Sequence, residues 1–231
     1  IYQTREFEER FLKVGLGYRV LGGTKFYERA EVKDAVAYLR IISQKYDDLA
    51  LERVIGSPRR GIGESTLNQL YSFGSKNKLC LEDSIKKSLE TNVLKPKMKT
   101  SLTQLTKMID KWRLDSNTNK HYDLLKIVLD ESGYSAMLKE KKDIENENRL
   151  ENIKELLRAM HDYDSLQSFL EHVALATSID KEWEGEKINL MTMHAAKGLE
   201  FDVVFLPGWE EGLFPHQKSL EEKGDSGLEE E

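Results

Sequence analysis

The residues best suited to chemistry lie in one polar segment between two apolar runs near the end of the chain. Residues 188–206 read INLMTMHAAKGLEFDVVFL, with Thr192, His194, Gly198 and Glu200 among the polar or small members. The carboxylate of Glu200 can accept a hydrogen bond from a sugar hydroxyl. A glycine such as Gly198 permits a positive φ or a close approach of the backbone to a ligand. From spacing alone, a ligand-binding loop and an ordinary surface loop are equally good interpretations.

A second candidate is the stretch PRRGIGEST, which ends at Thr66 and predicts a tight turn between two short helices. Gly61 and Gly63 leave backbone N–H groups uncovered where the second helix presents its positive end, so a phosphate could bind there regardless of base sequence. Arg60 could add a charge, and Thr66 a hydroxyl hydrogen bond. The alternative is an αα-hairpin turn whose glycines serve chain geometry only, and the carboxylate of Glu64 counts against an anion.

Several catalytic and metal-binding patterns are missing from the sequence. No G-x-x-x-x-G-K-[ST] phosphate loop occurs, because Gly22–Lys25 has the wrong order and spacing. No apolar strand ends in an Asp-Glu pair that would hold Mg²⁺. Phosphoryl transfer needs a phosphate cradle, a metal site and a charge-neutralising arginine together. The single cysteine, Cys80, cannot form an internal disulfide and gives no zinc or redox spacing. The sequence therefore predicts no complete catalytic site and no metal site in this chain.

Two flanks of mixed α/β character must position these residues. In the first flank, the apolar pattern predicts a helix at Thr4–Val14 and a strand at Tyr18–Leu21. In the second flank, a strand is expected at Ile188–Met191. The run Phe201–Leu206, apolar except for Asp202, predicts a second strand, fully buried in a parallel sheet.

The long middle of the chain is almost purely helical in pattern. Apolar residues recur there at three- and four-residue spacing, as at Leu102 and Leu105, and each stripe needs neighbouring helices to cover it. We therefore expect an incomplete parallel-sheet α/β domain, residues 1–46 and 187–231, interrupted by an inserted all-α domain at residues 47–186.

Composition places the chain among globular proteins. Of its 231 residues, 39 % are hydrophobic and 33 % are charged, and no apolar run is long enough to span a membrane. The charged start carries no secretory signal and only one cysteine is present, so we expect a cytoplasmic protein. Because the sequence opens at Ile1 and stops within an acidic run, we also expect a piece of a larger protein.

The net charge of −6 is unevenly distributed. Residues 221–231 hold six acids and one lysine, which leaves the rest of the chain close to neutral. Local basic clusters therefore matter more for a nucleic-acid partner than the total does, although such clusters are commonly no more than solvated faces. The clusters are Lys25, Arg29 and Lys33; Arg53, Arg59 and Arg60; and Lys95, Lys97 and Lys99.

Three stretches, in order, resemble the superfamily 1 DNA helicases of the UvrD/PcrA/Rep type. GGTKFYERAEVKD at residues 22–34 is similar to that family's GGxxFxxRxExKD element, and the PRRGIGEST turn is similar to its GIG element. LMTMHAAKGLEF at residues 190–201, continued by EEGLFP at residues 210–215, resembles its motif V. The resemblance covers essentially the whole chain. It implies that the flanks are part of the second RecA-like subdomain, 2A, and that the helical middle is the inserted subdomain 2B.

Carried onto this sequence residue by residue, the resemblance implies contacts with ATP and DNA. Glu200 would contact the ATP ribose, with Gly198 near the nucleotide, in a cleft shared with the N-terminal RecA-like subdomain of the same parent chain. Thr192 and His194 would face single-stranded DNA, and Arg5 is also placed among the DNA-contacting residues. The GIG turn, with Arg60, Gly61, Gly63 and Thr66, would hold duplex DNA.

The resemblance further implies a parent that is a 3′–5′ DNA helicase using ATP and Mg²⁺ in repair or replication. This chain alone is expected not to hydrolyse ATP, since Walker A, Walker B and the arginine-bearing motif VI are missing. The sequence leaves two alternatives open: the helicase module of an AddA- or RecB-like nuclease-helicase, and a non-catalytic module for DNA binding or partner docking. Arg29, Glu31 and Lys33 fit equally well as a structural ion-pair network or as DNA contacts.

Overall fold

The computed structural model describes residues 4–91, 94–140, 143–178 and 185–208. It separates into two compact units, residues 1–192 and 193–231. None of the helices in the described ranges is long and apolar enough to cross a membrane.

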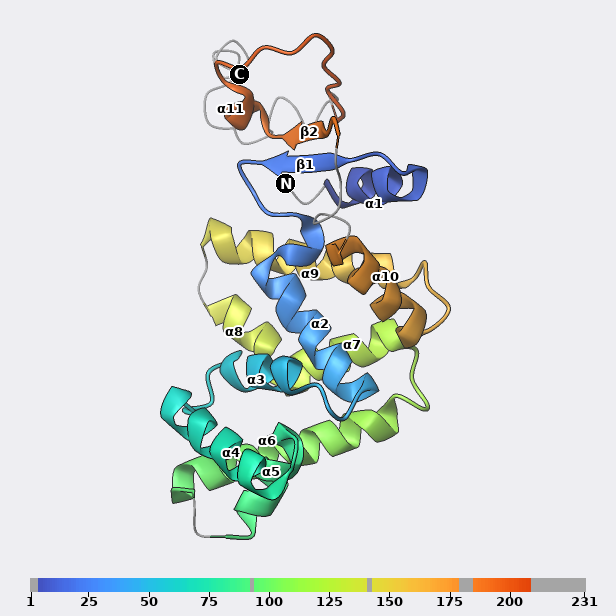
Figure 1. Cartoon of the computed structure of the whole chain (residues 1–231). Coiled ribbons are helices and arrows are strands. Elements are labelled where there is room, and N and C mark those ends of the chain that lie inside the picture. The colour runs from blue at the N-terminus through green and yellow to red at the C-terminus, as the bar shows by residue number, and fades with distance from the viewer. Residues whose placement is uncertain (1–3, 92–93, 141–142, 179–184, 209–231) are drawn as a thin grey trace. The chain divides into compact units, whose positions relative to one another are not determined.

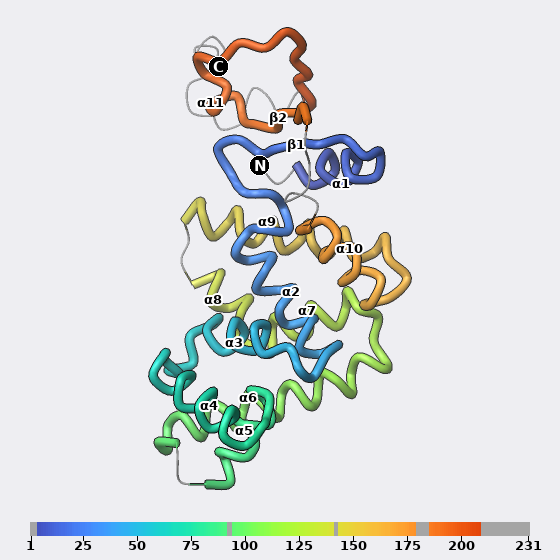
Figure 2. The backbone as a smooth tube through the Cα atoms, viewed as in Figure 1, coloured from blue at the N-terminus to red at the C-terminus, as the bar shows by residue number. Residues whose placement is uncertain are grey.

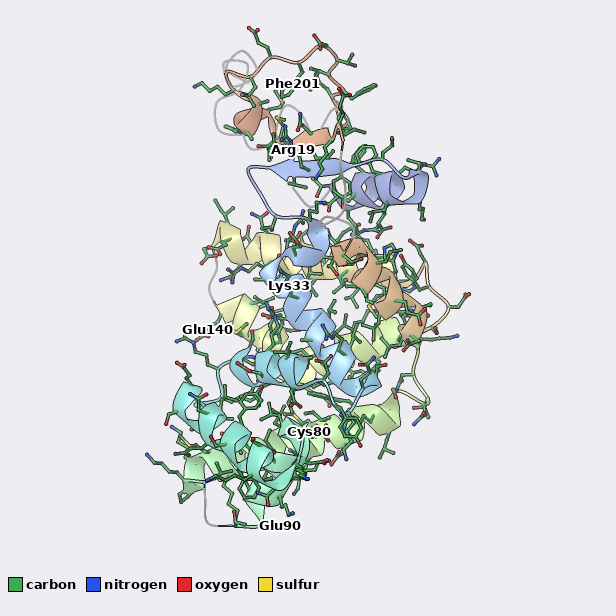
Figure 3. All side chains as sticks on the ribbon, in the orientation of Figure 1. Arg19, Lys33, Cys80, Glu90, Glu140 and Phe201 are labelled. Carbon is green, nitrogen blue, oxygen red and sulfur yellow. The ribbon has the colours of Figure 1, made fainter. Side chains whose placement is uncertain are left out.

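The two flanks of the chain meet in a parallel pair of strands within the first unit. Strand β1, Tyr18–Leu21, pairs in parallel with β2, Ile188–Met191, in the register Tyr18 to Ile188 and Leu21 to Met191. Helix α1, Thr4–Val14, precedes β1 and lies beside it (Figure 1). Arg19 of β1, labelled in Figure 3, is the register partner of Asn189, and its Nε donates to Asn189 Oδ1 at 2.5 Å. The bounds expected for α1, β1 and β2 are thus confirmed.

Helices make up nearly all of the first unit between the two strands. Local capping sets several of their ends: Asp47 accepts from the N–H of Ala50 at 3.0 Å and Asp143 from that of Asn146 at 2.7 Å. A short 3₁₀ segment, η1 at Phe26–Glu28, leads into α2 at Ala30–Ser43. The further helices are α3 Asp48–Gly56, α4 Glu64–Asn77, α5 Leu81–Leu89, α6 Pro96–Asp115, α7 His121–Glu131, α8 Tyr134–Glu140, α9 Ile144–Met160 and α10 Leu166–Ser178.

Helix α2 runs through the middle of these helices (Figure 2). It packs against α3, α6, α7, α9 and α10. The side chain of Tyr38 on α2 is fully buried, in edge-to-face contact with the rings of Trp112 and Tyr134. Sequence placed α2 before the start of the inserted domain at residue 47, whereas its apolar face is part of the helical core. The division at residues 46/47 and 186/187 stays a prediction.

The described part of the second unit holds one short helix, α11 at Met193–Ala196, followed by irregular chain to residue 208. The prediction of a buried strand at Phe201–Leu206 is wrong for this structure. These residues form no strand, and their apolar side chains are exposed, to 87 % for Phe205; Figure 3 labels Phe201 among them. A strand buried on both faces needs hydrogen-bonding neighbours and covering helices. Within the described residues, β1 and β2 pair only with each other.

Candidate nucleotide and DNA interface

The first candidate segment begins directly after β2. Thr192, half-buried, is the last residue of the first unit, and the other predicted residues belong to the second. His194 is exposed on α11. A turn follows, in which the N–H of Leu199 donates to the carbonyl of Ala196 at 2.9 Å.

Gly198 and Glu200 lie in and just after this turn. Gly198 has a φ of +81°, a conformation that favours glycine, and a Cβ placed there would meet nothing within 4 Å. The carboxylate of Glu200 is on an exposed residue and takes part in no ion pair within the described chain. Open backbone next to an exposed acceptor fits a sugar or nucleotide ligand. The structure therefore brings His194, Gly198 and Glu200 into one accessible segment, and their roles stay predictions.

The second candidate is the turn between α3 and α4. The bond Ser57–Pro58 is cis, and the carbonyl of Ser57 accepts from the hydroxyl of Tyr38 at 2.8 Å. Gly61 has a φ of +72°, so this position requires the freedom of glycine. The tight turn between two helices that the sequence predicted is confirmed.

Gly63 is the N-cap of α4 and has an ordinary extended backbone, with φ −96° and ψ 175°. A Cβ at Gly63 would meet nothing within 4 Å, so steric need does not account for a glycine there. The N–H groups of Glu64 and Ser65 have no acceptor within the described part of the chain. The start of α4 therefore presents open donors to solvent, with the exposed carboxylate of Glu64 as the opposing charge.

Two side chains of this turn that the sequence predicted to contact DNA point into the protein. The guanidinium of Arg60 donates to the carbonyls of Val54 and Pro58, the latter at 2.9 Å, and to the Tyr38 hydroxyl at 2.9 Å. Thr66 is buried, and its hydroxyl contacts the sulfur of Met98 at 3.3 Å. Arg60 thus closes the C-terminal end of α3 and fixes the turn, and a direct contact of either side chain with DNA stays a prediction.

Arg5 also faces inward. It is 4 % exposed, and its guanidinium pairs with Glu9 at 2.9 Å and with Glu155 of α9 at 2.7 Å, as well as with Glu6. Burial by itself would lower the pKa of Arg5, but the hydrogen bond to Glu155 and the charge of Glu9 outweigh it and raise the pKa. The guanidinium is held charged by carboxylates on two helices, and its predicted contact with DNA stays a prediction.

The buried polar contacts of Arg5 belong to a polar junction where α1, α2 and α9 meet. This junction also includes two of the residues whose role the sequence left open. Arg29 is buried and donates to Asn152 Oδ1 at 2.6 Å and to the Thr4 hydroxyl at 2.8 Å. The Asn152 amide in turn donates to the buried Glu31 at 2.5 Å. Burial lowers the pKa of Arg29. Buried hydrogen bonds of Arg29 and Glu31 therefore join α1, α2 and α9, which favours the structural alternative for these two residues. Lys33, by contrast, is exposed on α2 (Figure 3).

Sequence reasoning missed Asn152 and Glu155, which complete this junction from α9. A signal was present in α1, where Arg5, Glu8 and Glu9 are spaced to share one helix face. The structure turns that face inward: Glu8 accepts from the N–H of Phe26 at 3.0 Å and Glu9 from the Tyr27 hydroxyl at 2.9 Å. Nothing in the sequence indicates which later helix supplies the partners.

Comparison with known proteins identifies the family. Residues 2–231 match the model of the UvrD-like helicase C-terminal domain. The chain belongs to this family.

Its relatives include a protein named DNA helicase II from Rickettsia typhi, 45 % identical over 232 residues. Two proteins named ATP-dependent DNA helicase PcrA, from Bacillus subtilis and Staphylococcus aureus, are 40 % and 35 % identical. The alignments cover 99 to 100 % of this chain but only 32 to 35 % of each relative. The chain thus spans about a third of the length of the curated relatives it matches.

Proposed function

We propose that this chain is a section of an ATP-dependent 3′–5′ DNA helicase that acts in DNA repair or replication in the cytoplasm. The observation that carries the proposal is the parallel pairing of β1 with β2, which come from opposite flanks of the helical region. In a parallel sheet, ligands bind at the carboxyl ends of the strands. The segment from Thr192 to Glu200 begins at the carboxyl end of β2, and relatives that align with the whole chain carry helicase names. The flanks then correspond to subdomain 2A and the helical middle to 2B.

In this proposal, ATP is bound between subdomain 2A and the N-terminal RecA-like subdomain of the parent. Glu200 accepts a hydrogen bond from the ribose, and the open backbone at Gly198 lies near the nucleotide. The parent's Mg²⁺ neutralises phosphate charge during hydrolysis. Because the sequence has no phosphate loop, no Asp-Glu strand and no motif VI, the chain alone binds no Mg·ATP productively and does not turn ATP over.

DNA is proposed to contact two places. Single-stranded DNA runs past Thr192 and His194, which follow the end of β2. Duplex DNA lies on the GIG turn, where a phosphate meets the N–H groups at the start of α4 near Gly61 and Gly63. Backbone amides at the start of a helix bind phosphate oxygens and do not contact the bases, so this contact is independent of DNA sequence. Its affinity falls as the salt concentration rises.

The test compares the full-length parent with this chain on two matched substrates, a duplex with a 3′ single-stranded tail and one with a 5′ tail. We expect ATP-dependent unwinding by the parent of the 3′-tailed substrate only. The chain alone should show no ATP turnover above background. Unwinding only from the 5′ tail would contradict the direction. Turnover by the isolated chain that persists through repurification would contradict its place as an incomplete motor.

A further inference from the structure

Three lysines lie at the start of α6 and take no part in the polar contacts that join α1, α2 and α9. Lys95 is the N-cap residue of α6, and Lys97 and Lys99 lie in its first turn. Lys95 and Lys97 are exposed, while Lys99 is half-buried and donates to the carbonyl of Thr91 at 3.5 Å. Within the described residues, no carboxylate lies within ion-pair distance of any of the three. Their charges are therefore not offset by the fold.

Their position is also unfavourable for the helix itself. The first turn of a helix carries partial positive charge and is stabilised by acidic side chains. Helix α6 has no acidic residue in its first turn and no side-chain cap at Lys95. Other helices of the chain follow the usual preference, for example α9, which has Glu145 and Glu147 in its first turn and Asp143 as its cap. Stability of α6 thus gives no reason for three lysines there.

The start of α6 lies against the start of α4. The contact is between Thr66, the third residue of α4, and Met98, the third residue of α6, at 3.3 Å from Oγ1 to Sδ. The lysines on either side of Met98 therefore lie near the first turn of α4, which directly follows the GIG turn. Beyond Glu64, the hollow along α4 is lined by residues without an acidic side chain: Ser65, Asn68, Gln69, Ser72, Phe73 and Lys76.

We propose that Lys95, Lys97 and Lys99 bind phosphates of duplex DNA and extend the contact of the GIG turn onto a second helix. This inference rests on the proposed function and adds a site to it. Neutralised phosphates release counterions, so each lysine strengthens binding in a salt-dependent way. Because an ammonium is a point charge that does not read base edges, the site accepts any sequence.

The experiment measures binding of a short blunt duplex by this chain over a series of salt concentrations. The test variant replaces all three lysines, as Lys95→Gln, Lys97→Gln and Lys99→Gln. The control replaces three exposed lysines elsewhere, Lys107→Gln, Lys120→Gln and Lys139→Gln, which changes the net charge by the same amount. Urea unfolding and circular dichroism of both variants show whether the fold is retained.

We expect the test variant to lose duplex affinity. The plot of the logarithm of the association constant against the logarithm of salt concentration should become less steep by about 3, at about 0.9 for each phosphate contact. The slope for the control variant should stay within about 1 of the slope for the unmodified chain. Equal affinity and slope in the test variant and the unmodified chain would overturn the lysine site, while duplex binding by the unmodified chain would leave the proposed function standing. A loss confined to single-stranded DNA of the same sequence would also overturn it. Absence of any duplex binding at low salt would contradict both the site and the GIG contact.

Discussion

Arg5 Nε donates to Glu155 Oε1 at 2.7 Å and so joins the first helix to α9 across 150 residues of sequence. Both side chains are almost entirely buried. A buried ion pair adds little stability compared with apolar packing, but removing one partner leaves a costly uncompensated charge. The attachment of α1 to the helical region therefore depends on complete pairing of its charges.

Replacing Glu155 with Gln should destabilise the chain. Glu155→Gln keeps the shape of the side chain but removes the charge that faces Arg5, whose remaining buried partner is Glu9. We expect the free energy of unfolding to fall by about 2–4 kcal/mol. Urea unfolding measures it. The matched variant Glu171→Gln alters an exposed carboxylate on α10, and its free energy of unfolding should stay within about 0.5 kcal/mol of that of the unmodified chain. Equal effects of the two substitutions would show that the junction contributes nothing specific.

His172 should make stability depend on pH. The ring lies against Tyr27 and Tyr163, and burial lowers its pKa below the ordinary 6.5, with Lys13 and Arg5 acting in the same direction and Glu9 against it. Since the unfolded chain takes up the proton at higher pH than the folded chain, the contribution of His172 is fully present above pH 6.5 and is lost as the pH falls.

The corresponding measurement is the free energy of unfolding between about pH 7 and pH 5 for the chain and for His172→Phe. The decline toward acid should be shallower in His172→Phe. The control is His161→Gln, at an exposed histidine stacked on Tyr122. Identical slopes for the chain and His172→Phe would contradict the lowered pKa.

Gly63 allows a test of the GIG turn that leaves the fold intact. Its extended backbone and the open space around it accept a side chain, whereas a substitution at Gly61 is strained by its positive φ. Gly63→Val should obstruct the approach of a phosphate to the start of α4. We expect a loss of duplex affinity of about 1 kcal/mol, or about fivefold.

The matched control is Gly56→Val at the end of α3, where a Cβ also meets nothing within 4 Å. Binding is measured at low salt, and unfolding of both variants is followed in urea. If Gly63→Val binds duplex as well as Gly56→Val does, the proposed phosphate contact at the start of α4 is contradicted.

Glu200 should contribute to nucleotide affinity in the full-length parent. Glu200→Gln weakens an acceptor of the ribose hydroxyls, and a hydrogen bond to a charged group corresponds to about 1.5–3 kcal/mol, or at least about tenfold in affinity. The control is Asp202→Asn, an exposed carboxylate two residues on.

A second nucleotide makes the ribose contact testable by itself. With 2′,3′-dideoxy-ATP, the parent and Glu200→Gln should bind equally, because the hydroxyl partner is missing from the ligand. If the affinity difference persists with the dideoxy compound, Glu200 acts elsewhere than on the ribose.

Local structure was predictable where local pattern decides it. The apolar spacing of α1 and the runs at Tyr18–Leu21 and Ile188–Met191 gave their observed bounds. The mostly apolar run Phe201–Leu206 led to a wrong prediction of a strand, because burial of such a run depends on neighbours that its own residues do not specify.

The direction in which side chains point was less predictable than the elements. Arg60 and Thr66 are residue types suited to phosphate, yet the turn directs one to backbone carbonyls and the other to Met98. Their orientation is set by how α3, α4 and α6 pack, and those contacts are distant in sequence. Gly61 was recognisable because its requirement is local: a positive φ within a tight turn.

The pairing of β1 with β2 also constrains the order in which the chain assembles. Arg19 and Asn189 meet across 170 residues, so forming the pair early would close a very long loop without compensating contacts. Pairs of helices next to each other in sequence, such as α2 with α3 and α4 with α5, need no such closure. On this basis the strands should come together after the helices have collapsed, and protection of their amides from hydrogen exchange would mark the last step of folding.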